Sequence, residues 1–170
     1  ANDTPADCRN RAIVALLLAS GITSAEIRAA TGDALDLDAR PAVLSVPRNR
    51  ARPARRIALA AFAVAPLAAW RARSTDVPPS TRLFPAPRGG AMNDMFLLLV
   101  VRDALNAIGF RAADMSPRVL RNTYARRQLL AGHAHADVTT MLGLASLRTV
   151  TRIRQTLPPD AAADRAARER

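Results

Sequence analysis

Lysine is absent from this chain of 170 residues, so its 25 basic residues are all arginines. They outnumber the 14 aspartates and glutamates, which gives a formal net charge of +11 and a pI of about 11.7. A guanidinium stays protonated at any working pH and can bind a phosphate through two parallel hydrogen bonds. A GC-rich genome would explain the choice of arginine over lysine, but not the excess of positive charge. The charge balance therefore indicates a polyanionic partner.

Cysteine and long apolar stretches are also scarce. The single cysteine, Cys8, excludes a disulfide framework and a zinc site built from several cysteines. The longest apolar runs, 12–19, 57–70 and 95–101, are too short to cross a bilayer, and the first residues show no signal-peptide pattern. Because 49% of the residues are hydrophobic and 23% charged, a packed core can form. We therefore expect a compact cytoplasmic domain.

Acidic residues are missing from three stretches of the chain. Residues 39–75 hold eight arginines and no Asp or Glu, while 115–136 and 138–159 hold four and three arginines, again without an acid. Six of the acidic residues lie instead within the first 38 positions. A single run of this kind is commonly a solvated surface, but three in one chain favour nucleic-acid binding. Such binding releases counterions and should weaken steeply with salt.

Helix caps and turn residues predict the order of the secondary structure. Thr4 and Thr23 each precede an acidic residue by three positions, the capping-box pattern that opens a helix, and Gly21 is placed to end the first helix. The remaining elements are expected as strands over 34–37, 42–46 and 55–59 and helices over 66–73, 93–107, 116–131, 137–142 and 146–156. The predicted fold class is α+β and mainly helical, with a small three-stranded antiparallel sheet.

Several segments carry a resemblance to a known family. They read RNRAIVALLLASGI (9–22), DALDLD (33–38), LFP (83–85), MSPRVLRNTYA (115–125), LLAG (129–132) and MLGLAS (141–146). In this order and spacing they resemble the catalytic domain of the tyrosine recombinase (phage integrase) family. That family has a box Ser-Pro-His-x-Leu-Arg-His-Thr-Phe-Ala and a later Leu-Gly-His-Ser. The resemblance covers residues 9–156 and implies one such domain over 1–157, followed by a polar tail, 158–170.

Members of this family cut DNA with a tyrosine that attacks a phosphodiester, and the reaction needs no metal. Two arginines stabilise the five-coordinate phosphorus, a lysine in the loop between the second and third strands protonates the leaving oxygen, and two His or His/Trp positions assist. The resemblance puts other residues at most of these positions: Thr23 for the first arginine, Arg118 and Asn122 for the histidines of the box, Leu144 for the later histidine, and Ile153 at or beside the tyrosine. The second arginine is retained as Arg121. Because the lysine loop holds only arginines, which are poor proton donors, we expect no catalysis.

Four other reactive residues match no catalytic position of the family. Tyr124, the only tyrosine, lies three residues after Arg121, where the family keeps an aromatic residue that packs into the core. His133 and His135 follow a glycine helix stop, and two histidines without a third ligand make a weak metal site, so we expect them in a surface loop. Cys8 has no histidine partner nearby in the sequence and is expected to be buried and unreactive.

The resemblance thus implies a DNA-binding protein with a catalytically degenerate recombinase fold, linked to DNA recombination or its regulation and associated with a bacterial nucleoid. Its expected partner is double-stranded DNA, with no cofactor and no metal. The predicted phosphate contacts are Arg48, Arg50, Arg52, Arg55, Arg118, Arg121, Arg148, Arg152 and Arg154. These contacts position the protein and carry no base readout.

Two alternatives stay open. The chain could be an active strand-transferase with a divergent active site, or a module that keeps the fold to dock another protein or a second copy through the tail, 158–170. Family members usually also carry an N-terminal helical domain that closes a clamp round the duplex. We expect that half to lie outside this chain or to have been lost, and half a clamp implies weaker and less selective binding.

Overall fold

The computed structural model describes residues 4–49, 52–73, 78–86 and 90–158. Its helices are α1 (Pro5–Ser20), α2 (Ser24–Ala29), α3 (Val64–Arg71), α4 (Asp94–Ala107), α5 (Pro117–Leu130), α6 (His135–Met141) and α7 (Arg148–Gln155). Two 3₁₀ turns, η1 (Gly32–Ala34) and η2 (Ala61–Ala63), and three strands, β1 (Leu35–Asp36), β2 (Val43–Val46) and β3 (Arg55–Ala58), complete the described elements. The predicted fold class, mainly helical α+β with a three-stranded antiparallel sheet, is confirmed.

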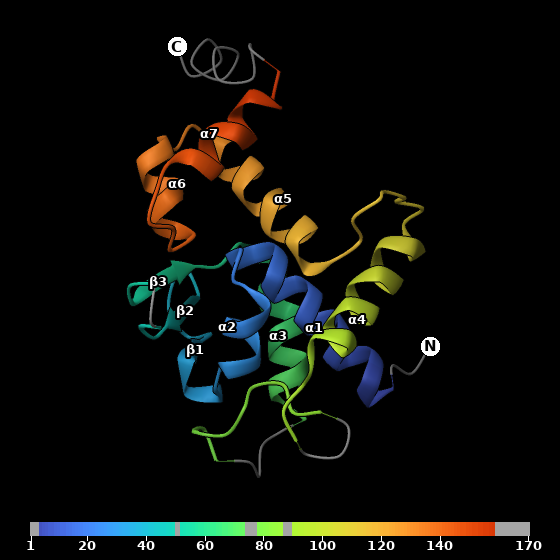
Figure 1. The fold of residues 1–170 in the computed structure, drawn as a ribbon. Coiled ribbons are helices and arrows are strands. Elements are labelled where there is room, and N and C mark those ends of the chain that lie inside the picture. The colour runs from blue at the N-terminus through green and yellow to red at the C-terminus, as the bar shows by residue number, and fades with distance from the viewer. Residues whose placement is uncertain (1–3, 50–51, 74–77, 87–89, 159–170) are drawn as a thin grey trace.

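Helix α1 is the centre of the fold. It begins at the predicted capping box, where the Thr4 hydroxyl accepts a hydrogen bond from the Asp7 N–H, and it ends at Gly21, whose φ of 61° lies in the left-handed region. Helices α3, α4 and α5 all pack against it (Figure 1). Because it has neighbours on several sides, most of its apolar residues are buried.

The sheet turns one face toward the core. The strands pair in the order β1-β2-β3, and the register sets Leu35 opposite Leu44 and Leu44 opposite Ile57. These three side chains are buried, whereas Ser45 and Arg56, one position along their strands, are exposed. This alternation follows from the two-residue period of a strand. Strand β3 is an edge strand of the sheet and contacts α6 (Figure 1).

Helix boundaries differ from the predicted ones by about a turn or less. Helix α3 begins at Val64, so Pro66 is its third residue; proline is tolerated there because the first N–H groups of a helix have no partner within it. Helix α6 begins at His135 rather than 137, and α7 begins at Arg148 rather than 146. No helix within the described residues is long and apolar enough to cross a membrane.

Candidate nucleic-acid interface

Arg55 is a predicted phosphate contact whose side chain is buried. It opens β3, and its side chain is only 5% exposed. Its Nε donates to the Met141 carbonyl oxygen (2.9 Å), and its Nη1 lies 2.9 Å from Glu26 Oε1 in an ion pair whose carboxylate side chain is 4% exposed. Its Nη2 is buried without a hydrogen-bond partner. Arg55 therefore ties β3 to α2 and α6 before any ligand binds.

Glu26 serves two functions in this arrangement. Its Oε2 accepts hydrogen bonds from the Thr23 N–H (2.8 Å) and hydroxyl (3.0 Å), which completes the capping box of α2, while Oε1 faces Arg55. Burial raises the pKa of the Glu26 carboxyl, but the hydrogen bonds from Arg55 and Thr23 outweigh burial, so the pKa lies below its ordinary value. Glu26 is therefore charged at neutral pH.

The backbone of a glycine lies close to the Arg55 guanidinium. Gly143 has a φ of 62°, and a Cβ built on it would lie 2.7 Å from Arg55 Nη1 and 2.9 Å from Cζ. Both the backbone conformation and the space therefore require glycine here.

Arg121 of α5 binds backbone carbonyls. Its Nη1 donates to the Gly21 oxygen at the end of α1, and its Nη2 donates to the Leu142 oxygen at the end of α6 (2.7 Å). The pKa of Arg121 is lowered to about 10, mainly by burial and also by the nearby charges of Arg52 and Arg55, while Glu26 raises it. The negative end of a helix dipole favours a cation, so this guanidinium stabilises two helix ends at once.

A pocket of about 270 Å³ lies between the start of α2 and the start of α5. It is lined by Ile22, Thr23, Ser24, Pro117, Arg118 and Arg121. Arg52, from the loop between β2 and β3, is not one of the lining residues but contacts one of them, with Nη1 3.5 Å from the Thr23 hydroxyl. Arg118 is 73% exposed and pairs with Asp114 at 2.9 Å, a surface contact of small energy. We call Arg52, Arg55, Arg121, Thr23 and Glu26 the arginine cluster.

The other predicted contacts lie outside this cluster. Arg48 is exposed at the start of the same loop, and Arg50 falls outside the described residues. Arg148, Arg152 and Arg154 lie on α7, which packs on α5 and α6; the first two are exposed and the third is half-buried. The structure thus brings Arg52, Arg55 and Arg121 together, with Arg118 at the rim, and leaves α7 as a separate basic helix.

The residues that the sequence prediction assigns to the remaining catalytic positions have little reactive chemistry. Ile153 is 8% exposed on α7, Leu144 is half-buried, and the Thr23 hydroxyl is engaged in the α2 cap. Tyr124 is 2% exposed, as predicted for a core residue, and packs against Gly21, where an added Cβ would collide with its ring. Burial also raises the pKa of the Tyr124 phenol.

Comparison with known proteins decides the family. The model of the phage integrase family matches residues 1–156 of this chain. The chain belongs to the phage integrase family. Its relatives include the tyrosine recombinases XerC of Xanthomonas axonopodis pv. citri (strain 306), 26% identical, and of Xylella fastidiosa (strain M23), 29% identical, both over 147 residues and 86% of this chain. The matches cover 47% and 48% of those proteins, so the chain spans about half their length.

Solved structures share the integrase fold. XerA recombinase superposes with a TM-score of 0.78 at 23% identity, over 97% of this chain and 57% of that one. XerH, in a post-cleavage complex with palindromic difH substrate, gives a TM-score of 0.80 at 22% identity, over 98% of this chain and 47% of that one. At these identities the comparison shows a common fold, in agreement with the predicted tyrosine-recombinase-like domain.

The histidines and the cysteine of this integrase-family chain lie apart from the arginine cluster. His133 is exposed in the turn after α5, as predicted, whereas His135 is the first residue of α6 and half-buried rather than in a loop. Cys8 is free and buried on α1, as predicted. Among the residues that the structure describes, no three His, Cys, Asp or Glu side chains gather as a metal site.

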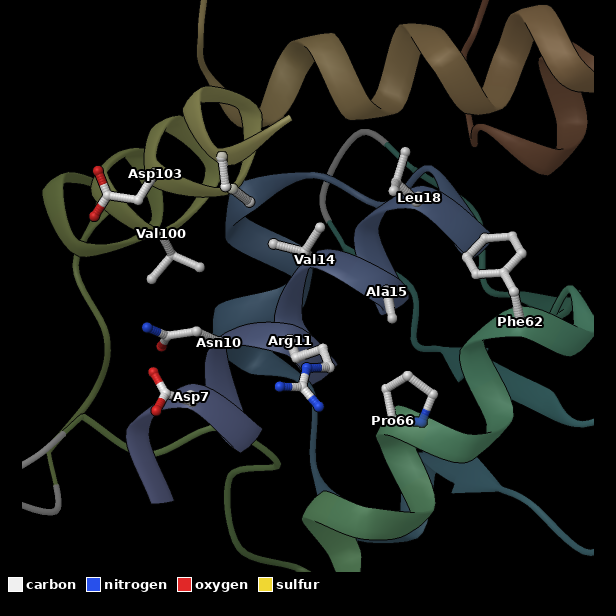
Figure 2. A pocket seen from close by; sticks show the side chains of 12 residues that line it. Asp7, Asn10, Arg11, Val14, Ala15, Leu18, Phe62, Pro66, Val100 and Asp103 are labelled. Atoms are coloured by element: carbon white, nitrogen blue, oxygen red, sulfur yellow. The ribbon is translucent and has the colours of Figure 1, made fainter. Parts of the chain in front are cut away.

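A second pocket, of about 580 Å³, lies along α1 on the face toward α3 and α4. Figure 2 shows Phe62 and Pro66 on one side of it, Val100, Asp7 and Asp103 on the other, and Arg11 between them. Its walls are largely apolar, and none of the predicted phosphate contacts lines it. We call it the apolar pocket.

The sequence prediction misses Glu26 of the arginine cluster and Gly143, which contacts the cluster. Glu26 is recognised from sequence only as a helix cap, but it also neutralises Arg55, 29 positions away. Gly143 lies in the segment 141–146 that resembles the family, yet its contact with Arg55 depends on the tertiary fold. The sequence signal that could have identified Glu26 as a partner of an arginine was its position, since this acid precedes the acid-free, arginine-rich stretch 39–75.

Proposed function

We propose that this chain is a DNA-binding module of the integrase fold, acting in DNA recombination or its regulation, that does not itself cut the strand. Ile153, at or beside the position of the family's nucleophilic tyrosine, carries the proposal. Its side chain is hydrocarbon and 8% exposed on α7, so it offers no atom that could attack a phosphodiester.

Tyr124 is a poor substitute for the missing nucleophile. It is 2% exposed against the end of α1, and burial raises the pKa of its phenol, which disfavours the phenolate. The general acid is lacking as well, because no lysine exists in the chain. Binding without cleavage is the function that these residues support best.

Charge supports DNA as the ligand. The formal net charge is +11, and exposed arginines occur on the β2–β3 loop, at the start of α5 and on α7. The relatives are named tyrosine recombinases, and XerH has been crystallised with its difH substrate. Guanidinium contacts to phosphates give strong binding with little sequence preference.

A nicked suicide substrate tests the absence of cleavage. An active strand-transferase leaves a covalent protein–DNA adduct that survives denaturation; we expect none here, while duplex binding persists in a gel-shift assay. An adduct, whether on Tyr124 or elsewhere, would show that the chain is an enzyme with a divergent active site.

The salt dependence of binding tests the assignment of the arginines. The double variant R48A/R52A removes two arginines from the β2–β3 loop, and the slope of log affinity against log salt should fall by about 2. The control R102A/R111A removes two exposed arginines at α4 and just beyond it, on another part of the surface, and should leave the slope unchanged. Equal slopes for the two variants would contradict binding through the loop.

A further inference from the structure

The apolar pocket follows one face of α1. Its lining residues on α1 and on α4 recur every three or four positions, so each helix turns a single face toward it. In Figure 2, Val14 lies on the floor that α1 provides, between Val100 on α4 and Phe62 on the opposite wall. Val14 and Leu18 are only half-buried, although both pack against the hydrophobic core. Their remaining exposure leaves an apolar floor open to a partner.

Phe62 gives the same face an exposed apolar side chain. It lies on η2 and is 47% exposed, and the Arg127 guanidinium covers one face of its ring, with 4.8 Å between the guanidinium carbon and the ring centroid. One surface therefore holds both an exposed ring and an apolar pocket of about 580 Å³. Such a surface is complementary to a second copy of itself, because a twofold axis sets the ring of each copy against the pocket of the other and makes every contact twice.

The charges around the apolar pocket have both signs. Asp7, Asp103 and Arg11 line it, and all three are exposed. The whole chain has a formal net charge of +11, so two copies repel each other at long range, and a docking surface between them must supply its own attraction. A surface with both signs does so, because the arginine of one copy can face an acid of the other in a symmetric pair.

Asp103 is the acid better placed for such a pair. Asp7 already serves the capping box of α1, where its Oδ2 accepts hydrogen bonds from the Thr4 N–H (3.2 Å) and hydroxyl (2.6 Å). Asp103 lies 4.0 Å from the neighbouring Arg102, at the limit of an ion pair, and both side chains are exposed. Arg11 of a second copy therefore competes with a weak contact at Asp103, but with a helix cap at Asp7.

We propose that the face formed by α1, η2, α3 and α4 is a symmetric docking surface for a second copy of this chain. The Phe62 ring of each copy lies in the apolar pocket of the other, and Arg11 and Asp103 form reciprocal pairs across the twofold axis. This inference goes beyond the proposed function and does not depend on it. None of the predicted phosphate contacts lines the apolar pocket, so the pairing of two copies does not use them.

Sedimentation equilibrium tests this surface. The wild-type chain, of 18.2 kDa, should be in equilibrium with its dimer at about 0.1 mM, and added salt should favour the dimer because it screens the repulsion between two chains of charge +11. Phe62→Asp should weaken dimerisation at least about tenfold, since it sets a carboxylate against each apolar pocket. The control Leu147→Asp makes the same change at a residue of similar exposure, 49% against 47%, next to α7, and should alter the dissociation constant by less than about twofold.

A charge swap tests the reciprocal pairs without relying on Phe62→Asp. Arg11→Asp and Asp103→Arg each set like charges opposite each other and should weaken dimerisation by about tenfold. An equimolar mixture of the two variants should dimerise like the wild type, because a mixed dimer again has two pairs of opposite charge. A lost fold in either variant cannot produce this recovery.

Three results would overturn the proposal. They are a wild type that stays monomeric at about 0.1 mM, a folded Phe62→Asp variant that dimerises like Leu147→Asp, and a mixture that associates no more than its two components. Each of them leaves the proposed DNA binding standing, because a gel-shift assay measures that binding separately. Circular dichroism checks that each variant is folded, and if Phe62→Asp does not fold, the mixture decides.

Discussion

The arginine cluster and the apolar pocket, two regions next to α1, differ in the kinds of side chain that they bring together. The arginine cluster lies at the C-terminal end of α1, where Gly21 offers a carbonyl and Arg52, Arg55 and Arg121 converge with one carboxylate. The apolar pocket lies along the preceding turns, and most of its wall is hydrocarbon, although Asp7, Arg11 and Asp103 also line it (Figure 2). One region gathers cations around one carboxylate, and the other is mainly apolar with charges of both signs.

The difference shows how the fold tolerates buried cations. Arg55 and Arg121 are held mainly by backbone carbonyls and by Glu26, so much of their charge is compensated inside the protein. Arg118, at the edge, is 73% exposed, and Arg52 has only a 3.5 Å contact with the Thr23 hydroxyl, so the fold holds these two guanidinium groups less firmly. Arginines held by the fold and arginines predicted to bind phosphate are therefore neighbours, and variants should separate them.

The largest expected effect comes from Glu26→Gln. It leaves the Arg55 charge buried beside a neutral amide, and breaking a buried ion pair costs about 3–5 kcal/mol of unfolding free energy. Urea denaturation measures it. The control Asp94→Asn breaks the exposed pair with Arg28 and should cost less than about 1 kcal/mol. Equal losses would mean that burial does not set the energy of these pairs.

Acid should reduce the stabilisation that the Glu26 carboxylate gives to the folded state. Because the pKa of Glu26 is lower in the folded state than its ordinary value of 4.5, its carboxylate stabilises the fold fully above that value and loses this effect as pH falls through the lowered pKa. The difference in unfolding free energy between wild type and Glu26→Gln should therefore shrink on acidification below pH 4.5. A constant difference down to the acid unfolding transition would argue against the charged pair.

Arg121→Met should have the next largest effect. The methionine fills similar space but leaves the Gly21 and Leu142 carbonyls without their donor, at a cost of about 2–3 kcal/mol. Arg121→Lys should recover part of the loss, because one ammonium cannot reproduce the fork of the guanidinium. Thermal and urea unfolding measure both variants. A loss of DNA affinity with unchanged stability would instead identify Arg121 as a ligand-binding residue only.

Gly143→Ala tests the close approach to Arg55. Its Cβ meets the guanidinium at 2.7 Å, so the variant should lose about 2 kcal/mol from strain and overpacking. Gly109→Ala is the matched control, since Gly109 also has a positive φ, 73°, but no atom within 4 Å of the added Cβ. It should lose only about 1 kcal/mol. If the two variants lose the same stability, the positive φ alone explains the effect and the close approach to Arg55 adds nothing.

The smallest effect is expected in the apolar pocket. Phe62 stacks under Arg127 with 4.8 Å between the guanidinium carbon and the ring centroid, so Phe62→Leu should cost about 0.5–1 kcal/mol. Duplex affinity should not change, because this pocket lacks the predicted phosphate contacts. A clear fall in affinity would extend the DNA-binding surface to this face of α1.

The sequence predicts what is local. Both capping boxes join residues three positions apart, and the strands follow from short alternating runs, so the order of elements could be derived. The arginine cluster could not, because Arg121 binds Gly21 from 100 positions away and Arg55 binds Met141 from 86. Their acceptors are backbone oxygens, which every residue type has. The residues assigned to the family's catalytic positions came from the family resemblance; these assignments and the roles of the arginines as phosphate contacts stay predictions.

The use of main-chain oxygens by Arg121 has an evolutionary consequence. Replacing Leu142 changes its side chain but keeps its carbonyl, so this contact tolerates substitution of the acceptor as long as the end of α6 keeps its place. Gly21 is constrained for a separate reason, since its φ is 61° and an added Cβ would collide with the Tyr124 ring. In an alignment the contact between Arg121 and Leu142 should therefore leave no covarying partner at position 142, although it joins α5 and α6.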